Sequence, residues 1–90
     1  MELKHSAVAG TLESSDIMIT VSPADDIEVN LTSTVEAYYG NSICATIRTV
    51  LDELGVRGLG VDAVDHGALD CTIRARLTTA VRRACTEASK

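Results

Sequence analysis

Aromatic side chains are almost missing from this chain of 90 residues, which has two tyrosines and no tryptophan or phenylalanine. Proteins that bind single-stranded nucleic acid stack the bases on exposed aromatic rings, so this composition offers little for that task. Basic residues are also few, eight against thirteen acidic ones, and the net charge of −5 argues against binding a phosphate backbone. We therefore expect no nucleic-acid partner, and a core built from Val, Ile, Leu and Ala.

Long apolar runs and paired cysteines are absent as well. No stretch approaches the roughly 20 apolar residues of a membrane helix, and the first ten residues lack the apolar run of a signal peptide. Cys44, Cys71 and Cys85 are odd in number and show no CxxC spacing, which favours reduced, buried thiols. We expect a cytoplasmic protein with no membrane partner, folded as one domain over residues 1–90.

Alternation of apolar and polar side chains predicts three strands in the first third of the chain. Residues 6–12 form a short strand rich in small side chains. Residues 17–21 alternate with a period of two. In residues 27–33, Ile, Val and Leu alternate with Glu, Asn and Thr, which is typical of a half-buried strand.

A helix is predicted after the third strand. Apolar residues recur at spacings of three or four across residues 35–54, and Gly55 then stands where a helix end favours glycine. Residues 33–36 have the pattern of a capping box at the start of this helix. The pair at residues 40–41, Gly-Asn, interrupts the apolar pattern and could split or kink the helix.

The last third of the chain fits two different structures. Residues 59–63 alternate as a strand, but residues 68–76 fit either a strand or the first half of a helix. We favour a strand for 68–76, because polar residues fill its alternate positions, with a turn at 65–67 closing a hairpin. A helix over residues 77–88 follows. The predicted fold is therefore α+β, a mostly antiparallel sheet with two helices on one face, in the order βββαββα.

Candidate metal ligands do not form a known motif. His66 has Asp62 and Asp65 nearby in the sequence, and Asp25 and Asp26 form an acidic pair. Neither group has the spacing of paired Cys and His ligands or of HExxH. Turn residues and a solvated charge pair explain them better, so we expect no metal site.

Candidate nucleophiles also lack a catalytic context. Ser14, Ser15 and Cys71 would each need a base within hydrogen-bond distance, and only His5 and His66 could serve. Neither histidine belongs to a catalytic motif, and GTLESSD is not the GxSxG nucleophile elbow. We expect a protein that has no catalytic residues of its own.

Arginines gather near the end of the chain, while acids dominate its first third. They are Arg74, Arg76, Arg82 and Arg83. They fit either a solvated surface with favourable charge at a helix end or a docking patch for an anionic partner. If they serve docking, we expect the strand face that carries Arg74 and Arg76 to do so.

One short segment, GTLESSD at residues 10–16, lies between two predicted strands and must form a tight, exposed turn. Ser and Asp suit tight turns through local side-chain hydrogen bonds. An exposed hydroxyl on a loop held by two strands is also what a covalent attachment site needs. The turn alone does not decide between a structural serine and a modified one.

Two separated motifs give the chain a family resemblance. The segments AVAGTLESSDIMITVSPAD and DHGALDCTIRARL, with STVEAYYGNSICATIRTVLDELGV between them, resemble the acyl carrier protein, or gamma subunit, of citrate lyase. The resemblance runs over residues 7–84. It implies a phosphoribosyl dephospho-coenzyme A group joined to a serine through a phosphodiester. The serine that follows the glutamate of GTLES is Ser14; Ser15 ranks second, because the family also accepts glycine there.

The resemblance further implies partners. They are the alpha (acyl transferase) and beta (citryl lyase) subunits of citrate lyase and the transferase that attaches the prosthetic group. The group would present acetyl and citryl thioesters for the cleavage of citrate to oxaloacetate and acetate. We also expect Glu13 and Asp16 to repel the anionic arm from the carrier surface.

Two other functions stay open at this point. The carrier subunit of malonate decarboxylase is related and carries the same kind of group, although GALDCTIRARL fits citrate lyase better. A small α+β interaction or regulatory module, with a merely structural serine turn, is the alternative from a different class.

Overall fold

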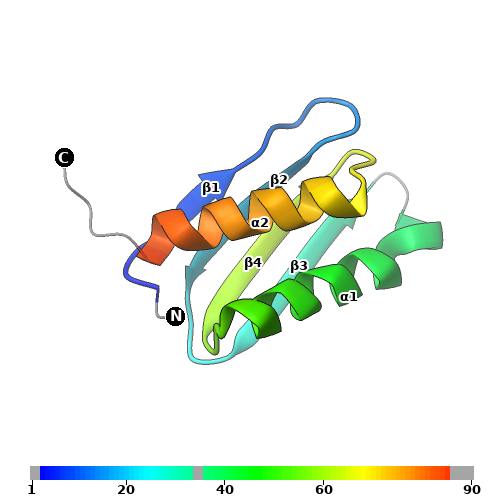
Figure 1. Cartoon of the computed structure of the whole chain (residues 1–90). Coiled ribbons are helices and arrows are strands. Elements are labelled where there is room, and N and C mark those ends of the chain that lie inside the picture. The colour runs from blue at the N-terminus through cyan, green and yellow to red at the C-terminus, as the bar shows by residue number, and fades with distance from the viewer. Residues whose placement is uncertain (1–2, 34–35, 86–90) are drawn as a thin grey trace.

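The computed structural model describes residues 3–33 and 36–85, with backbone alone for residues 36–41. Within these residues the chain forms four strands and two helices. In chain order they are β1 (Ala7–Ala9), β2 (Ile17–Pro23), β3 (Ile27–Ser33), α1 (Glu36–Leu54), β4 (Leu59–Asp65) and α2 (Asp70–Cys85). Both helices lie on the same face of the sheet, α1 over β3 and α2 over β1 and β2 (Figure 1).

The sheet is mixed but mostly antiparallel, with strand order β1-β2-β4-β3. β2 pairs antiparallel with both β1 and β4, whereas β3 and β4 run parallel. Parallel neighbours need a long crossover, and α1 supplies it. In this register Ile17 stands opposite Asp65, and Ser33 lies beside Asp65 on the other side. The start of β2 and the ends of β3 and β4 therefore meet at one edge of the sheet.

The core is aliphatic, as the composition predicts, and lies between the sheet and the helices. Alternate side chains of β2 and β4 are buried toward the helices, and each helix contributes a stripe of apolar side chains spaced three or four residues apart. The fully buried apolar side chains of largest volume are Ile17, Ile19, Ile47, Leu51, Leu59, Ile73, Leu77, Val21, Val61 and Val81. Neither helix covers the opposite face of the sheet, where Glu28, Asn30 and Asp62 are exposed.

The predicted α+β class, with a mostly antiparallel sheet and two helices, is confirmed, but the strand predicted over residues 68–76 is wrong. α2 already begins at Asp70, and the turn at 65–67 leads from β4 into this helix instead of closing a hairpin. The helical spacing of the apolar residues decides the structure. Those that α2 buries are Ile73, Leu77, Ala80, Val81 and Ala84. The polar residues at alternate positions fit the exposed side of a helix equally well, and that similarity misled the prediction.

Other expectations about the helices and the cysteines have mixed outcomes. α1 runs unbroken through residues 40–41 and ends before Gly55, whose φ of 72° is the left-handed conformation that favours glycine at a helix end. The capping box predicted at 33–36 and the helix predicted beyond residue 85 fall partly outside the described residues. All three cysteines are free, but the expected burial is wrong, because Cys71 is exposed and the other two are half-buried. Among the described residues no helix is both long and apolar enough to cross a membrane.

The connection from β1 to β2 depends on Gly10. Its φ is +94°, and a Cβ placed there would collide with the backbone carbonyl of Ile17. Only a residue without a side chain lets the chain leave β1 so close to the first residue of β2. Gly60, in β4, differs, because a Cβ there would stand 3.6 Å from the hydroxyl of Ser22, an ordinary contact.

We expect Gly10→Ala to lower the free energy of unfolding by about 1 to 3 kcal/mol, through the collision and the left-handed backbone together. Gly60→Ala is the matched control and should change it by less than about 0.5 kcal/mol. Urea unfolding followed by far-ultraviolet circular dichroism measures both. Equal stability of the two variants would contradict the role assigned to Gly10.

Candidate functional site

The loop at residues 10–16, which we call the serine loop, lies at the sheet edge where β3 and β4 end. The turn that joins β4 to α2 lies directly beside it (Figure 1). The backbone N–H of Ser15 donates to the carbonyl of His66 at 2.7 Å, and the N–H of His66 donates to the carbonyl of Asp16 at 2.9 Å. These two bonds extend the pairing of β2 with β4 past the ends of both strands. The serine loop is thus supported from the side by the turn at 66–69.

The tip of the serine loop is a β-turn. The N–H of Asp16 donates to the carbonyl of Glu13 at 3.2 Å, which puts Ser14 and Ser15 at the two central positions. Ser15 has a φ of 65°, a left-handed conformation that glycine adopts at no steric cost. This backbone gives a physical reason for glycine at the Ser15 position. Ser14 is exposed at the tip, and no hydrogen bond joins its hydroxyl to another residue that the structure describes.

Asp16 anchors the serine loop to α2. The guanidinium of Arg76 binds its carboxylate with both arms of the fork, Nε to Oδ1 at 3.0 Å and Nη2 to Oδ2 at 2.9 Å. The hydroxyl of Thr11 donates to Oδ2 at 2.7 Å, and the N–H of Ile17 donates to Oδ1 at 2.8 Å. The Thr11 oxygen also accepts the N–H of Glu13 at 3.2 Å. One carboxylate therefore ties both ends of the serine loop to a helix 60 residues further along the chain.

This network fixes the charge state of the carboxylate. The hydrogen bond from Arg76, followed by those from Thr11 and Ile17, holds the pKa of Asp16 well below its usual range. The same pairing raises the pKa of Arg76. Only 12 % of the Asp16 side chain is accessible, against 41 % for Arg76, so the carboxylate is the more enclosed partner. Such charge-assisted bidentate pairs are stronger than hydrogen bonds between neutral groups.

The structure bears on two expectations about charge, the repulsion of the arm by Asp16 and the arginine face on a strand. The negative charge of Asp16 is paired with Arg76, which removes much of the physical reason for the expected repulsion of an anionic arm by this residue; Glu13 is exposed, and its repulsion of the arm stays a prediction. The strand face expected to carry Arg74 and Arg76 does not exist, because both residues belong to α2. Arg74 forms an exposed ion pair with Glu53 at 3.0 Å. Of the four arginines considered as a docking patch, Arg76 instead binds Asp16 of the serine loop.

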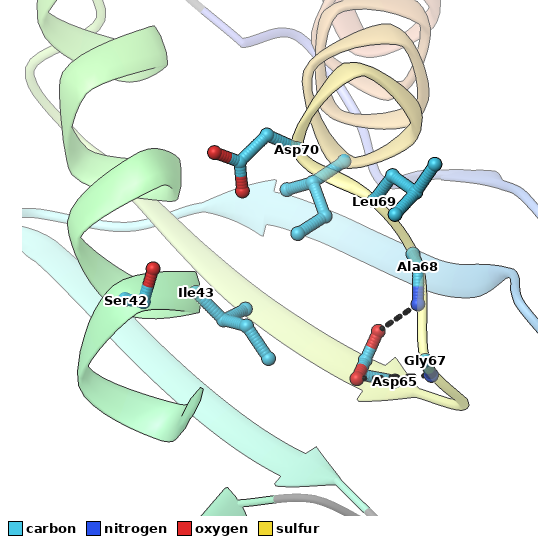
Figure 2. A pocket seen from close by; sticks show the side chains of 8 residues that line it. Ser42, Ile43, Asp65, Gly67, Ala68, Leu69 and Asp70 are labelled. Carbon is cyan, nitrogen blue, oxygen red and sulfur yellow. Dashed lines mark hydrogen bonds between the residues drawn. The ribbon is translucent and has the colours of Figure 1, made fainter. Parts of the chain in front are cut away.

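Asp65 closes β4 and starts the turn toward α2. This carboxylate is 1 % exposed and accepts the N–H groups of Gly67 at 3.1 Å and Ala68 at 3.0 Å, as Figure 2 shows. It also accepts the hydroxyl of Ser33 at 2.9 Å, from the end of β3. These bonds use the Asp65 oxygens to fix the turn. Asp62 lies on the other face of the sheet, since side chains alternate along a strand.

The structure does not gather the residues weighed for metal binding or catalysis into one site. No group of three or more His, Cys, Asp or Glu side chains within residues 3–33 and 36–85 is placed to hold a metal ion. His5 lies at the far end of α2, where its N–H donates to the carbonyl of Ala84 at 3.2 Å. His66 touches the serine loop through backbone atoms. Cys71 is exposed on the first turn of α2.

A hollow of about 460 Å³ opens between the second turn of α1 and the first turn of α2, and we call it the α1–α2 hollow. Sequence reasoning missed it, because its walls come from segments far apart in the chain. In Figure 2, Ser42 and Ile43 of α1 face the turn after β4 and the start of α2. The hollow is lined by Ser42, Ile43, Asp65, Gly67, Ala68, Leu69, Asp70 and Ile73.

We expect Arg76→Met to lower stability and to flatten its dependence on acid. Because the pKa of Asp16 falls on folding from about 3.8, the pair stabilises the fold above that pH and the effect is lost as the pH falls below it. Urea midpoints of the wild type should therefore drop more between about pH 5 and about pH 2 than those of Arg76→Met. Equal pH profiles would contradict the anchoring role.

Arg74→Met is the matched control for this experiment, because Arg74 lies on the same helix in an exposed ion pair. Exposed pairs contribute 0 to about 1 kcal/mol, so its unfolding free energy and pH profile should stay close to those of the wild type.

Comparison with known proteins finds similar sequences over most of the chain. The family model described as "Malonate decarboxylase delta subunit (MdcD)", of the acyl carrier protein type, matches residues 4–84. Curated proteins named citrate lyase acyl carrier protein are 56 % identical in Streptococcus mutans, 57 % in Streptococcus equi subsp. equi and 54 % in Lacticaseibacillus casei. Each match covers 93 % of this chain and 84 % of the relative.

A solved structure resembles the fold. One chain in the crystal structure of a Pseudomonas malonate decarboxylase hetero-tetramer in complex with malonate superposes with a TM-score of 0.66, over 90 % of this chain and 84 % of that one. At 20 % sequence identity this likeness shows the fold alone. The closeness of the named relatives confirms the resemblance predicted from the two motifs. The chain therefore belongs to the acyl carrier protein family that includes the citrate lyase acyl carrier proteins.

Proposed function

We propose that this carrier protein works as the gamma subunit of a citrate lyase complex, and that Ser14 is its attachment residue. The observation that carries the proposal is the exposed hydroxyl of Ser14 at the tip of a loop that hydrogen bonds hold to α2 and to the turn after β4. The named relatives, 54 to 57 % identical, support the choice of citrate lyase.

The residues of the serine loop fit a covalently attached phosphodiester. A serine hydroxyl is the chemical group that such a bond needs, and Ser14 holds it in solvent with no competing bond to a described residue. The group we propose is phosphoribosyl dephospho-coenzyme A. When attached, it would supply a terminal thiol that carries acetyl or citryl as a thioester. The carboxylate of Asp16 does not oppose the approach of an anion, because Arg76 neutralises it.

The contribution of the chain itself is to position the arm. Thr11, Asp16 and Arg76 fix the base of the serine loop, while the backbone of His66 supports its tip. A tether raises the effective concentration of the bound acyl group at each partner site, provided that the geometry lets it reach them. We propose the acyl transferase and citryl lyase subunits and a prosthetic-group transferase as partners. We further propose that residues 1–90 are one carrier domain, without catalytic residues, in the cytoplasm.

The two alternatives have less support. The family model is named for malonate decarboxylase, which supports the carrier subunit of that enzyme as an alternative. The curated relatives at 54 to 57 % identity are instead named for citrate lyase. An interaction module with a structural serine turn would leave the membership in an acyl carrier family unexplained.

Ser14→Ala tests the attachment residue. The protein is coexpressed with the dedicated transferase and partner subunits, and its intact mass is measured before and after peptide mapping of the serine loop. We expect the wild type to gain the mass of phosphoribosyl dephospho-coenzyme A on Ser14 and the variant to gain none. Citrate cleavage by the variant complex should then fall to background, because no acyl group can be carried.

Ser15→Gly is the matched control. Glycine adopts the left-handed backbone of that position without strain, so the shape of the turn is kept while its second hydroxyl is removed. This variant should be loaded like the wild type. Loading of Ser14→Ala together with loss of loading in Ser15→Gly would move the attachment to Ser15, and an unmodified wild type would reject the carrier mechanism proposed here.

A further inference from the structure

The α1–α2 hollow lies next to the serine loop. Gly67 lines the hollow, and a Cβ built on it would stand 4.0 Å from the Cα of Ser15. Ser15 also donates its N–H to the carbonyl of His66, the residue before Gly67. The backbone that forms the wall of the hollow at Gly67 therefore runs beside the tip of the serine loop. A long arm that starts at Ser14 has to cross only this wall to enter the hollow.

The hollow has the size and lining of a site for a small organic group. Ligand pockets commonly enclose about 300 to 1,000 Å³, with apolar walls and a few polar groups, and this hollow measures about 460 Å³. Ile43 and Ile73 are buried at its floor, and Ala68 and Leu69 line it from the turn. Leu69 is 70 % exposed, the highest value among the large apolar side chains that the structure describes as exposed. Contact with an apolar group would cover it.

The charges of the hollow select which part of an arm can enter. Asp65 and Asp70 both line it, and no basic side chain is among the lining residues that the structure describes. A phosphate placed between them would be repelled. A neutral chain with amide N–H donors is suited to the same place, because the Asp70 carboxylate points into the space between the helices (Figure 2). The Asp65 oxygens already accept hydrogen bonds from Ser33 and from the turn, so Asp70 is the better acceptor of the two carboxylates for a ligand.

We propose that the α1–α2 hollow binds the neutral, thiol-bearing end of the arm attached at Ser14, and so shields its thiol or thioester between visits to partner subunits. The proposal rests on the attachment function proposed above. The amide-containing chain and a small neutral acyl group such as acetyl lie against Ile43, Leu69 and Ile73. The phosphates of the arm stay outside, over the serine loop.

Ser42→Trp tests this proposal, because Ser42 lines the hollow from an exposed position on α1, where an indole would fill the space. Thr49→Trp is the matched control, since Thr49 is also exposed on α1, seven residues and about two turns further along. Both variants are loaded by the transferase, and circular dichroism checks that they are folded. The thiol of the loaded arm is then alkylated for timed intervals with iodoacetamide, and peptide mapping separates it from Cys44, Cys71 and Cys85.

If the hollow shields the arm, the thiol of Ser42→Trp should react about threefold faster or more than that of the wild type, which corresponds to a docked fraction of about two-thirds or above. Thr49→Trp should react at the wild-type rate. Loading should also shift the methyl resonances of Ile43, Leu69 and Ile73 in the wild type but not in Ser42→Trp. Equal alkylation rates in all three proteins, with shifts confined to the serine loop, would overturn the proposal while leaving the attachment at Ser14 intact. Absence of the arm from Ser14 would overturn the attachment function first.

Discussion

The bidentate pair between Asp16 and Arg76 is the constraint on which the rest of the functional end depends. A loop of seven residues with two serines at its tip would sample many shapes if only the two strands held it. The pair replaces that freedom with a fixed path, because the same carboxylate also accepts the hydroxyl of Thr11 from within the loop and the backbone N–H of Ile17 at the start of β2. The proposed chemistry belongs to Ser14, whose side chain is exposed at the tip of this loop. A rigid loop with an exposed hydroxyl at its tip suits the attachment of a long, mobile group.

The same pair joins the two separated motifs on which the family resemblance of this chain rests. GTLESSD supplies the carboxylate and the loop, and the helix in DCTIRARL supplies the guanidinium. The apolar side chains Ile73 and Leu77 fix the rotation of α2 on the sheet, and that rotation aims Arg76 at the serine loop. The packing of α2, its rotation on the sheet and the shape of the serine loop therefore depend on one another. A change in the core beneath α2 would be felt at Ser14, although the two places do not touch.

The sequence predicts the first three strands, the first helix, the aliphatic core and the position of the exposed serine. The prediction fails at 68–76 for a physical reason, because a short amphipathic segment with polar residues at every second position fits both the strand period and the helix period. Only the long-range contacts, Ile73 and Leu77 in the core and Arg76 on Asp16, select the helix. The α1–α2 hollow could not be predicted either, since it exists only where α1 packs beside the turn after β4. The ion pair of Asp16 could not be predicted from the sequence either, because its partner Arg76 lies 60 residues away and no basic residue stands next to Asp16 in the sequence.

The serine loop and the start of β1 lie at opposite ends of α2. Lys4 and His5 donate their N–H groups to the carbonyl of Ala84 at 2.8 and 3.2 Å, so the chain enters β1 beside the place where α2 ends. The serine loop lies at the other end of α2, whose 16 residues span about 24 Å (Figure 1). A polypeptide fused ahead of Lys4 or behind Ala84 would therefore start away from Ser14. Immobilisation through either of these two places would leave the exposed hydroxyl of Ser14 facing the solution.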